Sequence, residues 1–272
     1  MYEERLCAFV DILEFRELVG QSVYRPQIAQ KLLQILQRHV IQATPVWERN
    51  SPVSIIKSRY ERNGVPQNDA ARLAQQRVDQ YKREERGSVF SDSLILSAVV
   101  NDRAVGSLIA SLLFLSRGLA ELGIYVRGGI CLGKLHHDAD ICFGPGLIAA
   151  YDQEKKIAIY PRIIFERDAQ RVLARLQLPS MGELSDYFRE DFDGEAFLDF
   201  LSEKALSLSG DFRSEQMLEI RRKLCRQMSS FQSTSLGVKP KLHWFARYFN
   251  LVLGEAPIDG VSQLDIEKEF KD

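Results

Sequence analysis

Two aspartates at the ends of apolar segments are the residues best placed for chemistry. Asp11 directly follows Leu6–Val10, an apolar run that predicts a buried strand. Asp92 lies at the turn between two short apolar segments within 87–100, which predict a hairpin. In a split βαβ arrangement these points are neighbours, and adjacent carboxylates repel each other unless a cation such as Mg²⁺ or Mn²⁺ binds between them. The alternative is that each aspartate caps a turn or a helix.

The residues around this pair favour a phosphate-bearing substrate. A helix is predicted to begin directly after Asp11, and the free N–H groups at a helix N-terminus attract phosphate. Arg127 lies in a glycine-rich strand predicted over 123–135, and a guanidinium binds two phosphate oxygens at once. The alternative for Arg127 is a surface position on that strand.

The hydrophobic pattern predicts an α+β sandwich, in which helices cover one face of a mostly antiparallel sheet. Residues 43–67 contain three prolines and predict an irregular connection. Residues 1–180 form the predicted first domain. Residues 181–272 have helical patterns and no obvious strand, so we expect a boundary near residue 180 and a helical C-terminal extension.

Composition limits the partners and the compartment. Lys and Arg total 36 against 37 Asp and Glu, a formal charge of −1 that argues against a broad nucleic-acid-binding face. No apolar run approaches the ~20 residues of a membrane span, and the N-terminus lacks a signal-peptide pattern. The four cysteines show no CxxC spacing. We therefore expect a cytoplasmic protein with free thiols that binds neither membrane nor nucleic acid.

Four motifs within residues 6–170 resemble the catalytic core of class III nucleotidyl cyclases. They read FVDILEF, FSDSLIL, VRGGICLG and FGPGLIAAY. The resemblance implies a ferredoxin-like βαββαβ sandwich, two Mg²⁺ or Mn²⁺ ions per site, and composite sites built across a homodimer.

The same resemblance assigns roles to single residues. Asp11 and Asp92 match the two metal-binding aspartates, and the backbone carbonyl of Ile12 would complete a metal site. Phe15 matches a phenylalanine that would line the phosphate end. Arg127 matches the arginine that binds the triphosphate in this family.

Departures from the family pattern concern the base and the transition state. Ser88 stands where purine cyclases commonly carry a base-reading lysine, and Ile141–Cys142 occupy the region of the second base reader. In the helix motif, Ile148 and Asp152 replace the usual asparagine and the transition-state arginine. The usual readers of adenine and guanine are therefore absent.

These departures, together with RGGI and YPRI, resemble the pyrimidine cyclases of bacterial Pycsar anti-phage systems, which use UTP or CTP. The resemblance implies that this chain converts UTP or CTP into 3′,5′-cyclic UMP or cyclic CMP and pyrophosphate, as a second messenger in defence. Ser88 would lie beside the base, and Arg162 would replace the missing arginine. The alternative for Arg162 is a strand arginine paired with acidic side chains. Rival functions are a conventional adenylate or guanylate cyclase and a non-catalytic nucleotide-sensing module.

Two further groups have weaker chemical signals. His136, His137 and Asp138 include metal-ligand types, but adjacent residues project in different directions, so we interpret this stretch as a polar hairpin rather than a zinc site. Tyr151 and Glu154 are three residues apart on a predicted helix. They face either the other subunit of the implied dimer or a packing interface.

Overall fold

The protein is an α+β fold built on a mixed β-sheet. The computed structural model describes residues 2–41, 52–138, 141–177, 183–208, 213–229 and 237–266, which contain the eight strands of this sheet. The predicted α+β class is therefore confirmed.

The strands follow the order β2-β3-β1-β4-β6-β8-β7, and β5 pairs with the end of β4. Neighbouring strands are antiparallel, except that β4 and β6 are parallel. Their bounds are β1 (Glu3–Ile12), β2 (Glu85–Phe90), β3 (Ser93–Val99), β4 (Val126–His137), β5 (Cys142–Phe143), β6 (Ile163–Phe165), β7 (Phe188–Glu190) and β8 (Ala196–Leu198).

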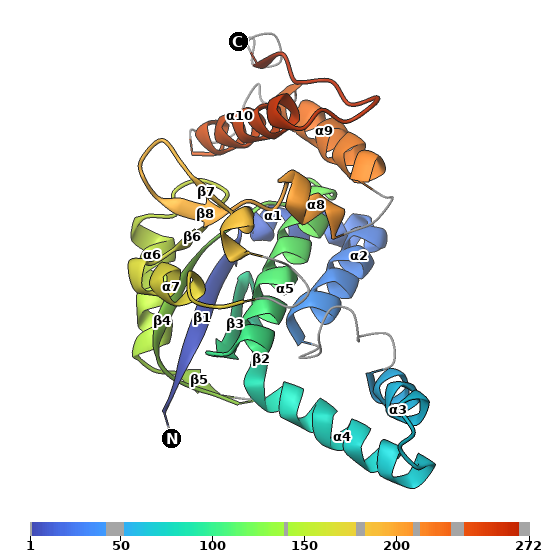
Figure 1. Ribbon diagram of the computed structural model, residues 1–272. Coiled ribbons are helices and arrows are strands. Elements are labelled where there is room, and N and C mark those ends of the chain that lie inside the picture. The colour runs from blue at the N-terminus through green and yellow to red at the C-terminus, as the bar shows by residue number, and fades with distance from the viewer. Residues whose placement is uncertain are drawn as a thin grey trace.

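Helices lie on both faces and at one end of the sheet, so the prediction that helices cover only one face is wrong (Figure 1). They are α1 (Phe15–Tyr24), α2 (Pro26–Leu36), α3 (Pro52–Arg62), α4 (Gln67–Glu84), α5 (Asp102–Ala120), α6 (Pro145–Lys156), α7 (Arg167–Leu173), α8 (Glu203–Ser207), α9 (Arg213–Ser229) and α10 (Lys239–Glu255). Figure 1 shows α9 and α10 across the end of the sheet where β1 ends and α1 begins.

The alternation of side chains along β1 assigns its two faces. Successive strand residues point to opposite sides of a sheet. The even-numbered residues enter the main core together with α2 and α5: Leu6, Ala8, Val10 and Ile12. Cys7 belongs instead to a smaller cluster with Ala150 of α6. Asp11 has the parity of Cys7 and therefore lies on the α6 face.

Two glycines of β4 allow α6 to pack directly on the strand. A Cβ atom on Gly129 would lie 2.4 Å from the Cβ of Gln153, and one on Gly133 would lie 2.7 Å from the Cα of Gly146. Any larger residue at these positions would displace the helix backbone. The close approach brings Glu154 of α6 against the start of β4.

Two segments differ from the sequence prediction. The predicted irregular connection over 43–67 contains α3, which packs on α4 through Ile56 and Val78. The prediction that 181–272 are wholly helical is wrong at β7 and β8, which extend the sheet from β6. A strand of three residues is too short to show alternation, so only tertiary pairing reveals it. The C-terminal segment thus shares the sheet with the first 180 residues.

The C-terminal helices attach to the segment that leads into β4. The ring centroid of Tyr125 lies 4.5 Å from that of Phe245 in α10. The Tyr125 hydroxyl donates to Oε1 of Gln227 in α9 at 2.7 Å, and Nε2 of Gln227 donates to the carbonyl of Gly123 at 2.7 Å. This anchoring holds α9 and α10 at the sheet end that also bears Asp11.

One helix in the described part of the chain, α5, is long and apolar enough to cross a membrane by composition. In the fold, 83% of its apolar window is buried against the sheet and the other helices. Burial of this kind is typical of a helix in a protein core. The cytoplasmic localisation stays a prediction.

Candidate active site

Asp11 and Asp92 are neighbours at one end of the sheet. The β2–β3 hairpin turns at Ser91 and Asp92, where Ser91 has a φ of 56°. Asp11 pairs with Ser93 across β1 and β3, and the N–H of Ile12 donates to the carbonyl of Asp92 at 2.8 Å. The structure thus brings the two predicted aspartates together, while their role as metal ligands stays a prediction.

Arg127 lies directly opposite Asp11 across β1 and β4. Its Nε is 3.3 Å from Oδ2 of Asp11 and 2.7 Å from Oε1 of Glu154, whose side chain is almost fully buried. Within the described chain, Nη1 and Nη2 of Arg127 have no protein hydrogen-bond acceptor. The Nε–H donates to Asp11, and Glu154 lies in ion-pair contact with the same nitrogen, so the outer fork of the guanidinium remains available for a bidentate anion.

The carboxylates of this site lie where negative charge is disfavoured. Burial raises the pKa of Asp11, Arg127 partly offsets this effect, and the charge of Asp92 raises the pKa further. Burial likewise raises the pKa of Glu154, against the opposing effect of Arg127. A divalent cation beside Asp11 and Asp92 would relieve both the desolvation and the mutual repulsion.

The oxygen ligands here fit Mg²⁺ or Mn²⁺. Asp11, Asp92 and the carbonyl of Ile12 are hard oxygen donors at one location. In the described ranges no three His, Cys, Asp or Glu side chains group together as a metal cage. Mg²⁺ does not require such a cage, because it is commonly held by one or two carboxylates together with waters and substrate phosphates.

Ser88 belongs to a hydrogen-bonded network on the same face of the sheet. Its hydroxyl lies 2.9 Å from Nε2 of His137, whose Nδ1 lies 2.9 Å from the hydroxyl of Ser97. Burial, together with the cations Arg5 and Arg86, lowers the pKa of His137 to about 4. The ring is therefore neutral near pH 7, with one donor and one acceptor nitrogen. His137 thus orients the Ser88 hydroxyl.

Phe15 and Ile12 flank the start of α1. The helix begins at Phe15, close after Asp11, as the sequence predicts. The Phe15 ring is half-buried and packs against the main core. Its predicted place at the phosphate end stays a prediction, and so does the metal-binding role of the Ile12 carbonyl.

Arg162 makes contacts that differ from those of the predicted catalytic cation. Its backbone carbonyl accepts from the N–H of Gly128, so the residue lies beside β4. Its side chain is fully buried and forms ion pairs with Asp191 and Asp193. Asp191 also accepts from Nε1 of Trp244 at 2.7 Å. These contacts match the alternative that we gave for Arg162, an arginine paired with acidic side chains.

The weaker groups have structural partners. The β4–β5 hairpin carries His136, which lies 3.1 Å from Asp138, while His137 bonds the two serines, and this agrees with a polar hairpin. Tyr151 packs edge-on against Phe9 on the α6 face. Glu154 contacts Arg127 of its own chain, which agrees with the packing alternative, and its place beside another subunit stays a prediction.

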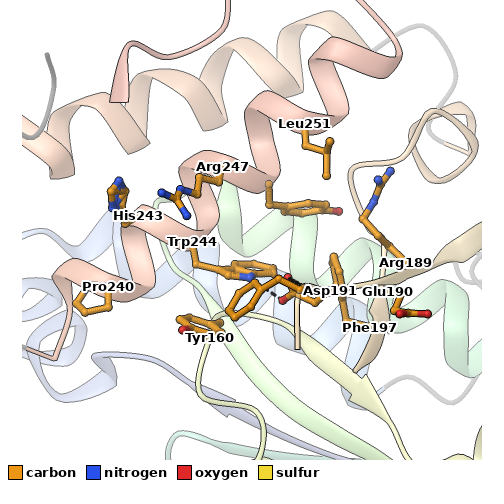
Figure 2. Close-up of a pocket in the computed structure, with 12 residues that line it drawn as sticks. Tyr160, Arg189, Glu190, Asp191, Phe197, Pro240, His243, Trp244, Arg247 and Leu251 are labelled. Carbon is orange, nitrogen blue, oxygen red and sulfur yellow. Dashed lines mark hydrogen bonds between the residues drawn. The ribbon is translucent and has the colours of Figure 1, made fainter. Parts of the chain in front are cut away.

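A pocket of about 450 Å³ lies between α10 and the β7–β8 hairpin (Figure 2). Aromatic side chains form part of its walls, with Tyr160 and Trp244 stacked at a centroid separation of 6.0 Å. None of the site residues predicted from the sequence lines it. The pocket is therefore distinct from the Asp11 site, although Trp244 hydrogen-bonds Asp191 and so connects it to Arg162.

Three residues around the Asp11 site were not predicted from sequence to belong to it. The sequence places Glu154 three residues after Tyr151 on a predicted helix. Where its side chain points depends on how closely α6 approaches β4. His137 has the ambiguous signal of a histidine pair. Lys241 of α10 interacts electrostatically with Asp11 and lies 230 positions away in sequence, so no motif connects them.

A scan of the chain against protein-family models finds no matching family, and a search of curated proteins finds no match either.

Proposed function

We propose that this protein is a nucleotidyl cyclase that converts a pyrimidine nucleoside triphosphate into a 3′,5′-cyclic nucleotide and pyrophosphate. The observation that carries the proposal is the convergence of Asp11, Asp92 and Arg127 at one end of the sheet. Two carboxylates beside a partly uncommitted guanidinium provide both halves of a metal–triphosphate site.

The topology supports the same proposal. Along the chain, β1 is followed by helices, then by β2 and β3, then by α5 and β4. In the sheet these strands lie in the order β2-β3-β1-β4. This succession is that of a βαββαβ sandwich. We propose that it is the class III cyclase arrangement, which the four motifs resemble.

Each side chain has a defined task in this proposal. Asp11, Asp92 and the Ile12 carbonyl would hold two divalent ions, which would acidify the attacking 3′-hydroxyl and neutralise the departing pyrophosphate. Arg127 binds phosphate oxygens through Nη1 and Nη2, while Glu154 fixes its Nε. The substrate is thereby oriented before reaction, which lowers the entropic part of the barrier.

A hydroxyl at position 88 is compatible with a pyrimidine base. Ser88 is oriented by neutral His137, and a hydroxyl both donates and accepts, so it can pair with the polar edge of uracil or cytosine. A purine cyclase would need other readers in place of the missing lysine. The role in anti-phage signalling rests on the resemblance alone.

Exposed apolar side chains support the homodimer that the resemblance implies. Phe90 pairs with Ser93 in the same row of the sheet as Asp11 and is 82% exposed, and Ile148 on α6 is 64% exposed. Apolar groups this accessible beside a site are typical of surfaces that a partner covers. We propose a symmetric dimer with composite sites.

The proposal is tested by incubating the purified full-length protein with ATP, GTP, CTP and UTP in competition, with Mn²⁺. We expect cyclic UMP or cyclic CMP as the main product and no product after chelation by EDTA. Preference for ATP or GTP would favour a conventional adenylate or guanylate cyclase. Binding of nucleotides without any product would favour a non-catalytic sensor.

Arg127→Ala is expected to weaken triphosphate binding. Because the truncation would also leave Glu154 buried without its counter-ion, the comparison is made in the Glu154→Gln background. There, loss of charged hydrogen bonds to phosphate, which contribute about 1.5–3 kcal/mol, should raise KM about 10- to 100-fold. Steady-state kinetics on both variants measure this ratio, and an unchanged KM would assign Arg127 a structural role.

A further inference from the structure

The helix α10 turns one face toward the sheet end that bears Asp11. Lys241, Trp244, Phe245 and Tyr248 recur at helical spacing and therefore share that face. The last three are buried. Trp244 donates to Asp191, and Phe245 packs against Tyr125 with the two rings tilted. Lys241 lies one turn before these anchors, in the first turn of the helix.

The anchors hold this face close to the site. The N–H of Leu13, two positions after Asp11, donates to the carbonyl of Tyr125 at 2.9 Å. Phe245 therefore packs against a residue that is hydrogen-bonded just beyond Asp11. Tyr125 also lies two positions before Arg127. Phe245 thus contacts the point where the end of β1 meets the start of β4.

The half-buried ammonium group of Lys241 interacts electrostatically with the charged groups of the site. It interacts electrostatically with Arg127, Glu14, Asp11 and Glu154, groups carried by β4, the β1–α1 turn, β1 and α6. In the described parts of the chain, no carboxylate lies in ion-pair contact with it. Burial first, and the charge of Arg127 second, lower the pKa of Lys241. Arg127 and Lys241 repel each other beside the same carboxylates. An anion bound between them would stabilise both positive charges.

We infer that Lys241 is a second phosphate-binding residue of the active site, placed there by the C-terminal segment and acting with Arg127 on the triphosphate. The inference rests on the proposed function. It assigns a task to α10, namely to supply positive charge from outside the βαββαβ unit. The C-terminal segment would then be required for substrate binding as well as for stability.

Binding of inorganic tripolyphosphate to the full-length protein with Mn²⁺ tests this inference by isothermal titration calorimetry. Loss of one charged contact should raise the Kd of Lys241→Met about 10-fold, and Lys241→Arg should restore most of the affinity. Lys239→Met is the matched control. It removes an exposed lysine about 200° around the same helix, so the Kd should stay within about twofold of the unsubstituted protein.

The outcomes separate this inference from the proposed function. If Lys241→Met binds tripolyphosphate as tightly as the unsubstituted protein, or if the unsubstituted protein does not bind it, Lys241 is not a phosphate-binding residue. If Lys241→Met weakens binding but the unsubstituted protein cyclises none of the four nucleotides, the anion site stands and the cyclase proposal fails. Unchanged circular dichroism of each variant shows that the effect is local.

Discussion

Asp11→Asn is expected to abolish nucleotide cyclisation while the protein stays folded. Asparagine keeps the volume of the side chain but removes the negative charge that would bind a divalent ion. A metal contributes several kcal/mol to charge stabilisation in such reactions, so kcat should fall at least about 100-fold. The same result is expected for Asp92→Asn, because the two carboxylates act on one site. Product formation with Mn²⁺, measured by chromatography, tests both variants.

A matched substitution separates this effect from a general loss of charge. Asp69→Asn changes an exposed aspartate of α4 that pairs with Arg72, outside the cluster. Its activity should stay close to that of the unsubstituted enzyme, since exposed helix pairs contribute about 0.3–0.5 kcal/mol. Near-normal turnover in Asp11→Asn or Asp92→Asn would contradict the metal-binding assignment.

Arg162→Met is expected to destabilise the protein strongly. The guanidinium is fully buried between Asp191 and Asp193, and its removal leaves carboxylates without their counter-ion. Breaking a buried ion pair from one side costs about 3–5 kcal/mol of unfolding free energy. Urea denaturation followed by circular dichroism measures this change.

The control is Arg171→Met, which removes an exposed partner of Asp168 and should change the free energy of unfolding by less than about 1 kcal/mol. This comparison also decides between the two interpretations of Arg162. If Arg162→Met kept the stability of the unsubstituted protein and lost only kcat, the side chain would be the catalytic cation that the resemblance implies. A large loss of stability assigns it to linking the β7–β8 hairpin to the sheet.

The elements around the site are predictable from sequence, because their signals are local. An apolar run before Asp11, two short apolar segments around Asp92 and a glycine-rich strand around Arg127 each predict their own conformation from neighbouring residues. The α+β class and the hairpin are both confirmed. The adjacency of Asp11 and Asp92 followed from the expected order of strands.

The partners of these residues, by contrast, depend on tertiary packing. The ion pair of Arg127 with Glu154 depends on the depth to which Gly129 and Gly133 admit α6, a distance that no local pattern encodes. The strands β7 and β8 exist because the edge of β6 pairs with them. The packing of α10 on Tyr125 brings Lys241 into electrostatic interaction with Asp11. Long-range contacts of this kind depend on how whole elements pack together. Neighbouring residues in the sequence therefore give no local signal of them.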